Sequence, residues 1–279
     1  MLITLAFVLF VSLYSALLAM RDKKMTPNPR QLKLLQHVNE HSSSTVDQLA
    51  SHLGVTVQTV RRDLQRLCEA KLLTRFHGGV RVPNSTIENI GYRQRESLHA
   101  EGKRRIAQAV ARAVPNGCSL LINIGTTTEA IARALLQHIG LRVITNNINV
   151  ASILSLNPDC EVIVTGGVVR PRDYGIVGEA TVDFIRQFKV DIALIGISGI
   201  ESDGSLRDYD YREVKVSQAI IAHAREVWLA TDASKFNRPA MVRVAELKQI
   251  DRLFTDAPPP DPFPDLLAHA QVQCDIAQG

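Results

Sequence analysis

Apolar positions between residues 44 and 67 recur at helical spacing and predict two short helices joined by a tight turn. The first helix carries Val46, Leu49, Ala50 and Leu53 on one face, and the second carries Val57, Val60, Leu64 and Leu67. Gly54 interrupts the pattern between them. The hydroxyl of Thr56 can cap the second helix by accepting a backbone N–H bond.

The polar face of the second helix predicts contact with DNA. Opposite its apolar stripe lie Gln58, Thr59, Arg62 and Arg66, with Arg61 on the flank. Arg62 and Arg66 repel each other at a spacing of i, i+4, and phosphates or base edges would relieve that repulsion. A helix-turn-helix recognition helix is built in this way, although a solvated helical hairpin would also carry a charged outer face.

Elements on either side extend this motif to a winged helix-turn-helix. A first helix is expected from residue 29 or 30 to about residue 40, with Leu32, Leu35 and Val38 facing the core. Residues 72–76 and 80–82 read as two strands around the turn His77-Gly78-Gly79. That hairpin would form the wing. Arg75 and His77 would then lie near the DNA backbone, where they add affinity but little sequence information.

From residue 91 onward the pattern predicts an α/β domain. Residues 91–114 form a connector ending in a helix, with Ile106, Val110 and Val114 on one side and the basic run 103–105 exposed. Apolar runs of strand length then alternate with helical segments, at 119–124, 142–145, 161–165, 192–197, 227–230 and 252–255. Continuous apolar strands separated by helices indicate a parallel sheet covered on both faces.

Small and polar residues follow most of these strands, and ligands of open parallel sheets bind beyond the carboxyl ends of the strands. The candidate ligand-binding residues are Gly125, Thr126, Thr127, Thr128, Asn146, Asn147, Gly166, Gly167, Glu179, Ser198, Glu213, Asp232 and Lys235. Hydroxyls, amides and a lysine suit a small phosphorylated polyol or sugar. Ordinary turns and helix caps would account for each residue taken singly.

Composition narrows the function further. Residues 21–112 hold 17 Lys and Arg against 8 Asp and Glu, whereas residues 113–279 hold 15 against 20, within a net charge of +4. The excess of positive charge in residues 21–112 is typical of a domain that binds a polyanion. Neither a Walker P-loop nor G-x-G-x-x-G is present, so no nucleotide cofactor is expected. The four scattered cysteines predict no metal site and a reducing, cytoplasmic compartment.

The segment Leu2–Ala19 is apolar and is followed by Arg21, Lys23 and Lys24. It could be a short membrane anchor with a positive flank, although it lacks the basic start of a signal peptide. We favour the alternative that residues 1–24 come from a mis-assigned start codon and that the functional chain begins at Met25, or at Met20. No membrane is then involved.

Several motifs together resemble the DeoR family of bacterial repressors. They are the stretch 45–67 with Val60-Arg61-Arg62-Asp63-Leu64, the turn 77–79, Asn123-Ile124-Gly125-Thr126-Thr127, Thr145-Asn146-Asn147, Gly166-Gly167, Gly178-Glu179-Ala180 and the run 232–236. The resemblance covers about residues 26–257. It implies a winged helix-turn-helix, a sensor domain related to sugar-phosphate isomerases, a phosphorylated effector and a homo-oligomer, either a dimer or a tetramer, on operator DNA.

Further motifs resemble the branch of that family that represses glycerol-3-phosphate metabolism genes. They are the segments 197–200, 202–206, 208–214 and 255–260. The resemblance implies that glycerol 3-phosphate releases the repressor from its operator. We therefore expect a DNA-binding domain at 27–82 with its helix-turn-helix at 44–63, a linker at 83–98, a sensor domain at 99–257 and a tail at 258–279.

Two other functions compete with this one. Glu179, Glu213, Asp232 and Lys235 could supply the base and electrophile of a sugar-phosphate isomerase that carries a DNA-binding appendage. The apolar leader could instead tether a regulator to the membrane. We expect a repressor without enzymatic activity, because ligand binding alone accounts for these residues.

Overall fold

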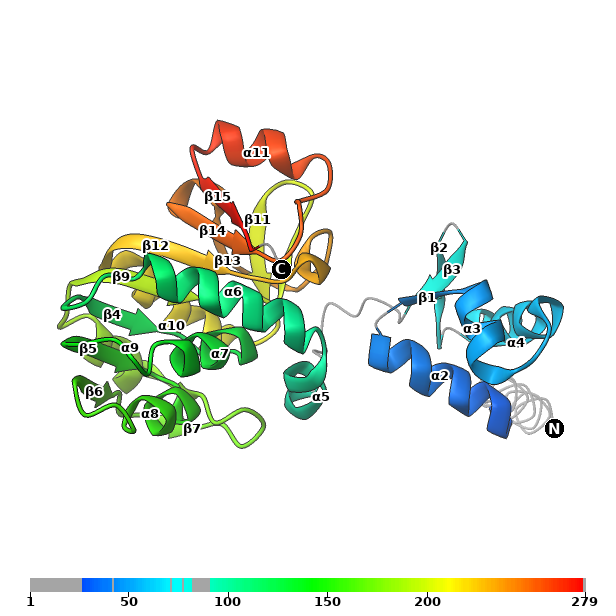
Figure 1. The fold of residues 1–279 in the computed structure, drawn as a ribbon, viewed down its shortest axis with the longest axis horizontal. Coiled ribbons are helices and arrows are strands. Elements are labelled where there is room, and N and C mark those ends of the chain that lie inside the picture. The colour runs from blue at the N-terminus through cyan, green and yellow to red at the C-terminus, as the bar shows by residue number, and fades with distance from the viewer. Residues whose placement is uncertain (1–26, 42, 71, 77, 82–90, 278–279) are drawn as a thin grey trace, which may run out of the picture. The chain divides into compact units, whose positions relative to one another are not determined.

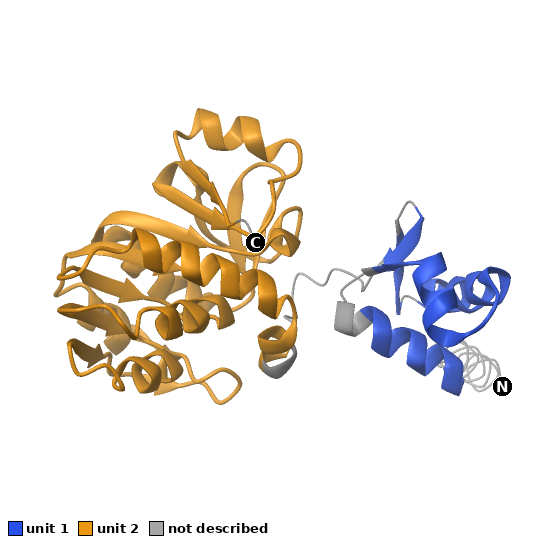
Figure 2. Ribbon diagram, viewed as in Figure 1, with its two compact units in different colours: residues 1–83 blue, residues 84–279 orange. Residues whose placement is uncertain are grey.

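The structure, a computed structural model, describes residues 27–41, 43–70, 72–76, 78–81 and 91–277 (Figure 1). The chain divides after Pro83 into an N-terminal and a C-terminal unit (Figure 2), each with its own apolar core. Within the described ranges, no helix is long and apolar enough to cross a membrane. The apolar leader lies outside those ranges.

In its described residues, the N-terminal unit contains three helices and a small antiparallel sheet. Its elements are α2 (Pro29–His41), β1 (Ser43–Thr45), α3 (Val46–Leu53), α4 (Val57–Glu69), β2 (Thr74–Phe76) and β3 (Gly79–Arg81). The sheet order is β1-β3-β2, so a strand that the sequence pattern did not indicate, β1, pairs with the hairpin. The helix-turn-helix and its following hairpin are therefore present.

Local hydrogen bonds explain where α3 and α4 begin and end. Thr45 and Gln48 form a capping box at the start of α3. Gly54 ends that helix in the left-handed conformation with φ 63°, which glycine adopts without the steric cost of a side chain. The Thr56 hydroxyl accepts the N–H of Thr59 at 3.3 Å, which confirms the predicted cap of α4.

The core face of α2 differs from the expected one. Leu32 is 53% exposed, whereas Gln31, Leu34 and Val38 are buried. The polar Gln31 points inward because its side-chain amide donates to the carboxylate of the buried Asp63 at 3.0 Å. The apolar positions therefore predicted Val38 and Leu35 correctly but misplaced Leu32 and missed the buried Gln31.

The C-terminal unit is built on a seven-stranded sheet in the order β15-β14-β12-β9-β4-β5-β6. The strands are β4 (Ser119–Ile122), β5 (Leu141–Thr145), β6 (Cys160–Val164), β9 (Val190–Ile195), β12 (Ala224–Ala230), β14 (Arg252–Thr255) and β15 (Gln273–Ile276). Every neighbouring pair is parallel, as the apolar runs predicted.

Helices cover both faces of this sheet (Figure 1). They are α6 (Ala100–Ala113), α7 (Thr126–Ala134), α8 (Ile148–Leu154), α9 (Glu179–Ile185), α10 (Tyr211–Ala222) and α11 (Phe263–His269). The short helix α5 (Tyr92–Ser97) lies next to α7. The cores are distinct: α6, α7 and α8 bury apolar residues with Leu120 and Ile122, whereas α9, α10 and α11 do so with Leu121. Alternate residues of one strand thus serve opposite layers.

Short elements surround the main sheet. A small antiparallel sheet holds β10 (Gly199–Ile200), β11 (Ser205–Asp208) and β13 (Val242–Glu246), and a hairpin holds β7 (Val168–Val169) and β8 (Ile176–Val177). Two single-turn 3₁₀ helices lie at Ala233–Lys235 and Leu247–Gln249. Most of these elements are too short to show a periodicity. The expected tail also differs, because it folds into α11 and β15, and β15 pairs with β14.

The buried Asp63 generates a stability prediction. Asp63→Ala leaves the Gln31 amide buried without its partner and frees Arg30, which contacts Asp63 at 2.6 Å. We expect the N-terminal unit to lose about 1–3 kcal/mol of unfolding free energy, measured by hydrogen exchange of α4 amides in the full chain. The control Asp47→Ala removes an exposed carboxylate and should stay within about 0.5 kcal/mol. Equal effects of the two substitutions would contradict the role of Asp63.

Candidate functional site

The outer face of α4 carries the predicted DNA-contacting side chains. Thr56, Gln58, Arg61, Arg62 and Arg66 are exposed, and Thr59 is half-buried. The hydroxyls of Thr56 and Thr59 also share a hydrogen bond of 2.9 Å, which orders the start of this helix. The opposite face is anchored in the core by Val60, Leu64 and Leu67.

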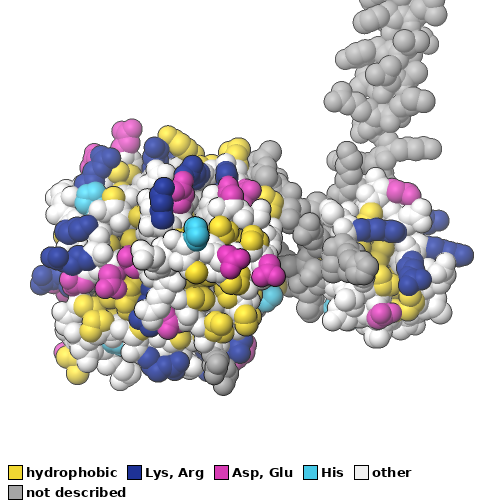
Figure 3. All heavy atoms as spheres, turned by 90° about the horizontal axis from the view of Figure 1, so that it is seen from above, with side chains coloured by type: hydrophobic (Ala, Val, Ile, Leu, Met, Phe, Trp, Pro, Cys, Tyr) yellow, Lys and Arg dark blue, Asp and Glu magenta, His cyan; other side chains and the backbone are white. Residues whose placement is uncertain are grey.

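The arginines of α4 remain available to a ligand. Among the described residues, none forms an ion pair with Arg61, Arg62 or Arg66. Arg75 on β2 is also exposed, whereas His77 lies outside the described residues. Figure 3 shows Lys and Arg side chains on the face of the N-terminal unit that it presents. Unpaired guanidinium groups can donate two hydrogen bonds to a phosphate or a guanine.

In the C-terminal unit, the chain connections leave β4 and β9 in opposite directions. The chain continues from β4 to β5 and β6 on one side, and from β9 to β12, β14 and β15 on the other. Such a reversal opens a crevice at the carboxyl ends of the two strands. A polar pocket lies there, and it extends to the end of β12.

This strand-end pocket collects seven of the thirteen candidate ligand-binding residues: Gly125, Thr126, Thr127, Ser198, Glu213, Asp232 and Lys235. Gly125 precedes α7 with φ 149°, a conformation that places the following backbone N–H groups at the helix start. Three cations line the same pocket, namely Arg95, Lys103 and Lys235. Hydroxyls, a helix start and cations together favour an anionic ligand.

The other six candidates lie outside the strand-end pocket: Thr128, Asn146, Asn147, Gly166, Gly167 and Glu179. Asn146 donates to the carbonyl of Ile176 at 3.1 Å, and Thr181 donates to that of Gly166 at 2.7 Å, so β8 and α9 cover the ends of β5 and β6. Gly167 packs so closely that a Cβ would lie 2.2 Å from the Thr181 hydroxyl. These residues therefore close the fold beside the pocket.

The remaining three have clear local positions. Asn147 caps α8 and donates to Glu129 at 3.3 Å, and the Thr128 hydroxyl donates to the Gly125 carbonyl at 2.8 Å. Glu179 is exposed at the start of α9. The structure thus does not bring all thirteen candidates to one pocket, because a hairpin fills part of that sheet edge.

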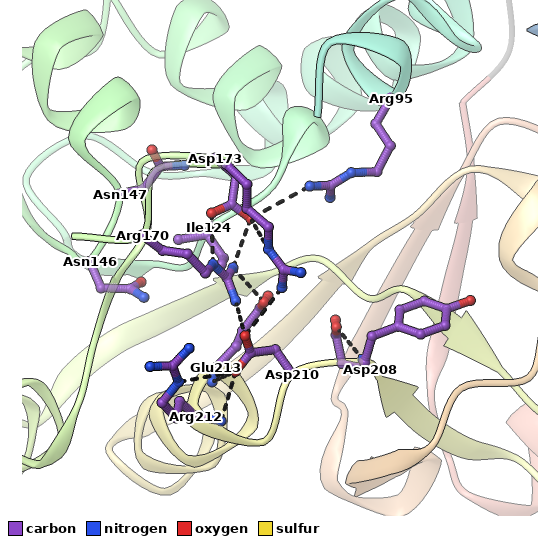
Figure 4. A network of polar contacts seen from close by, with 12 residues as sticks. Arg95, Ile124, Asn146, Asn147, Arg170, Asp173, Asp208, Asp210, Arg212 and Glu213 are labelled. Atoms are coloured by element: carbon purple, nitrogen blue, oxygen red, sulfur yellow. Dashed lines mark hydrogen bonds and ion pairs between the residues drawn. The ribbon is translucent and has the colours of Figure 1, made fainter. Parts of the chain in front are cut away.

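A buried ionic cluster forms one wall beside the strand-end pocket (Figure 4). The Arg170 guanidinium contacts Asp173 at 2.7 Å, Asp210 at 3.0 Å and Glu213 at 2.6 Å. We call these four residues the Arg170 cluster. It ties the β7–β8 connection to the start of α10. Since three carboxylates surround it, Arg170 is not free to bind an anionic ligand.

Burial changes the ionisation of two pocket residues. Desolvation, with the nearby charge of Asp208, raises the pKa of Glu213 to about 8 despite its contact with Arg170. Desolvation also lowers the pKa of Lys235 to about 8, although Asp232 opposes this shift. At neutral pH the pocket therefore combines a largely protonated Glu213 with a largely charged Lys235, a state that suits an anion.

Three charged residues of the pocket were missed in the sequence: Arg95, Lys103 and Asp208. Arg95 fell in the expected linker, and Asp208 is the last residue of β11, a short strand that the sequence pattern did not indicate. Lys103 was expected to be exposed with Arg104 and Arg105, but it is only 5% exposed. The helical spacing of the sequence does indicate that Lys103 is buried, because it shares its helix face with Ile106, Ala107 and Val110.

Two family domains match the chain. The DeoR-like helix-turn-helix domain matches residues 30–86, and the DeoR C terminal sensor domain matches residues 98–257. Among solved structures, ribose 5-phosphate isomerase A from Neisseria gonorrhoeae shares 14% identity with a TM-score of 0.36, over 51% of this chain and 54% of that one. That similarity is too weak to support an argument about function.

Similar proteins of known name are repressors. The glycerol-3-phosphate regulon repressor of Escherichia coli is 44% identical over 90% of this chain and 100% of its own length. The protein of that name from Haemophilus influenzae is 46% identical over 83% and 90%. The repressor CsqR of Escherichia coli is 40% identical over 91% and 97%. With a recognition helix, a strand-end pocket and both domain matches, the chain belongs to the DeoR family of DNA-binding transcriptional repressors with an effector-binding sensor domain.

Proposed function

We propose that this protein represses genes of glycerol-3-phosphate metabolism and leaves its operator when glycerol 3-phosphate occupies the strand-end pocket. The observation that carries the proposal is the convergence of Lys103 and Lys235 on the start of α7, where Thr126 lies. Two relatives with 44% and 46% identity that are named for that regulon support the choice of ligand. The N-terminal unit reads the operator, and the C-terminal unit senses the effector.

The phosphate of the effector occupies the start of α7. There the Thr126 and Thr127 hydroxyls and the backbone N–H groups donate to it, while Lys103 and Lys235 balance its charge. Ser198 and Asp232, at the ends of the next strands, bind the hydroxyl groups of the polyol. The effector needs only a differential affinity of a few kcal/mol between the DNA-binding and released states.

The pocket binds its ligand without converting it. An isomerase needs a base free to move a proton. Here Glu213 contacts Arg170 at 2.6 Å. Burial would raise the pKa of Asp232, but the charge of Lys235 and the Ser234 hydrogen bond lower it overall, which makes Asp232 a weak base. Incubation with sugar phosphates and product analysis should show no turnover, whereas a product would support the isomerase alternative.

The repressor acts as a homo-oligomer, so the half-sites of its operator DNA lie whole helical turns apart.

The exposed guanidinium of Arg62 should contribute to operator binding. Arg62→Ala is expected to weaken binding about 5- to 150-fold, the range for losing a good contact to a base edge. A gel shift with the upstream region of the protein's own operon measures this effect. Arg186→Ala removes the same charge from an exposed position directly after α9 and should leave the affinity within about 2-fold. An unchanged affinity of Arg62→Ala would remove this residue from the DNA interface.

The Thr126 hydroxyl should be needed for the response to effector. Thr126→Val keeps the shape of the side chain and removes a donor to the phosphate, so we expect about 10-fold weaker binding of glycerol 3-phosphate. Isothermal titration measures the affinity. The matched control is Thr165→Val, because the buried Thr165 hydroxyl lies outside the pocket and has no partner among the described residues. If Thr126→Val binds normally, the phosphate site lies elsewhere.

Effector affinity should fall as the pH rises from 7 to 9. Through the pKa values of about 8, Glu213 gains a negative charge and Lys235 loses its positive charge. The phosphate remains a dianion over this range, since its second pKa is about 6. Glu213→Gln keeps a polar partner for Arg170 without ionising, so it should fall less steeply with pH. Titrations at three pH values test this, and an affinity that is constant or rises contradicts it.

A further inference from the structure

Helix α5 joins the strand-end pocket to the chain that comes from the N-terminal unit. It is the first described element after the division at Pro83, and it belongs to the C-terminal unit. Its residue Arg95 lines the pocket. Along the chain, α5 is therefore the described part of the pocket that lies nearest to the DNA-binding unit.

The carboxyl-terminal end of α5 already occupies donors of the strand-end pocket. The Lys103 ammonium donates to the backbone carbonyls of Arg95 and Leu98, the latter at 2.7 Å. The Thr126 hydroxyl also donates to the carbonyl of Arg95, at 3.4 Å. Helix carbonyls at this end carry partial negative charge, so they bind the same kind of donor as an anion does.

A second contact holds the other end of α5. The Tyr92 hydroxyl donates to the carboxylate of Glu129 at 2.6 Å, and Asn149 donates to Tyr92 at 2.9 Å. Glu129 is only 1% exposed and lies on α7, one turn after Thr126. Burial, together with this hydrogen bond, raises the pKa of Tyr92, so the hydroxyl remains a donor.

The side chain of Arg95 adds a third contact. Its guanidinium lies 3.6 Å from the carboxylate of Asp173, a member of the Arg170 cluster (Figure 4). Helix α5 is thus held by α7, by α6 and by the connection between β7 and β8. Helix α8 contributes as well, through the bond from Asn149 to Tyr92.

We propose that α5 is an internal competitor of the effector: its carbonyls bind Lys103 and Thr126 in the free protein, and an entering phosphate takes these donors and releases the helix. This inference rests on the proposed function, because it assigns a regulatory consequence to ligand binding at the same site. Release of α5 changes the segment that leads to the DNA-binding unit. Since the coupling is reciprocal, anything that loosens α5 must also strengthen effector binding.

Hydrogen exchange of the full chain tests the release of α5 directly. We expect glycerol 3-phosphate to increase exchange of the amides in residues 92–98 at least 5-fold. Residues 106–113, in the second half of α6, serve as an internal reference and should not change. Inorganic phosphate as a second probe shows whether the anion alone is sufficient.

Tyr92→Phe tests the predicted sign of the coupling. Loss of the hydroxyl weakens α5 docking, so the variant should bind glycerol 3-phosphate about 5-fold more tightly and release operator DNA at a correspondingly lower concentration. A residue with a merely structural role would weaken ligand binding instead. The matched control Tyr209→Phe removes a hydroxyl that donates to the Pro239 carbonyl at 3.1 Å, away from α5. It should leave the effector affinity within about 2-fold.

The outcomes separate this inference from the proposed function. If glycerol 3-phosphate binds and releases DNA but exchange in residues 92–98 is unchanged or decreases, α5 is not a competitor and the proposed effector stands. If Tyr92→Phe binds glycerol 3-phosphate as tightly as the unmodified chain, or more weakly, α5 is likewise not a competitor. If no phosphate ester binds the unmodified chain, both proposals fail.

Discussion

The reversal of chain direction at β4 and β9 is the constraint on which the sensor depends. Because the connections leave these two parallel strands toward opposite edges, no crossover covers their carboxyl ends. The same ends deliver Gly125 and Ser198, and the neighbouring β12 delivers Asp232. Backbone topology thus creates the opening, and the residue types at three strand ends determine which ligand it suits.

The rest of the sheet edge is closed, and the Arg170 cluster explains how. One guanidinium between three carboxylates fixes the β7–β8 connection against α10, while β8 and α9 bond to the ends of β5 and β6. Desolvation of these groups is costly, and the ion-pair contacts of Arg170 with Asp173, Asp210 and Glu213 offset part of that cost. The cluster therefore limits the pocket to the central strands.

Periodicity predicted the elements with long apolar faces and missed contributions from polar residues. The helix-turn-helix and the parallel strands were identified because their apolar positions repeat at 3.6 or run continuously. Gln31, Asp63 and Lys103 are buried because hydrogen bonds satisfy their polar groups. The spacing of apolar residues contains no information about such bonds. Two-residue strands such as β10 show no period at all, and pocket residues such as Arg95 come from a segment read as a linker.

The Arg170 cluster also constrains how this sequence can change. Removing one member leaves buried charges without a partner, which is typically far more destabilising than replacing the whole set by apolar residues of similar volume. A protein in which only Arg170 or only Asp173 has been replaced is therefore expected to be poorly stable. The four positions are expected to change together or to remain as they are, so they should covary among relatives of this chain.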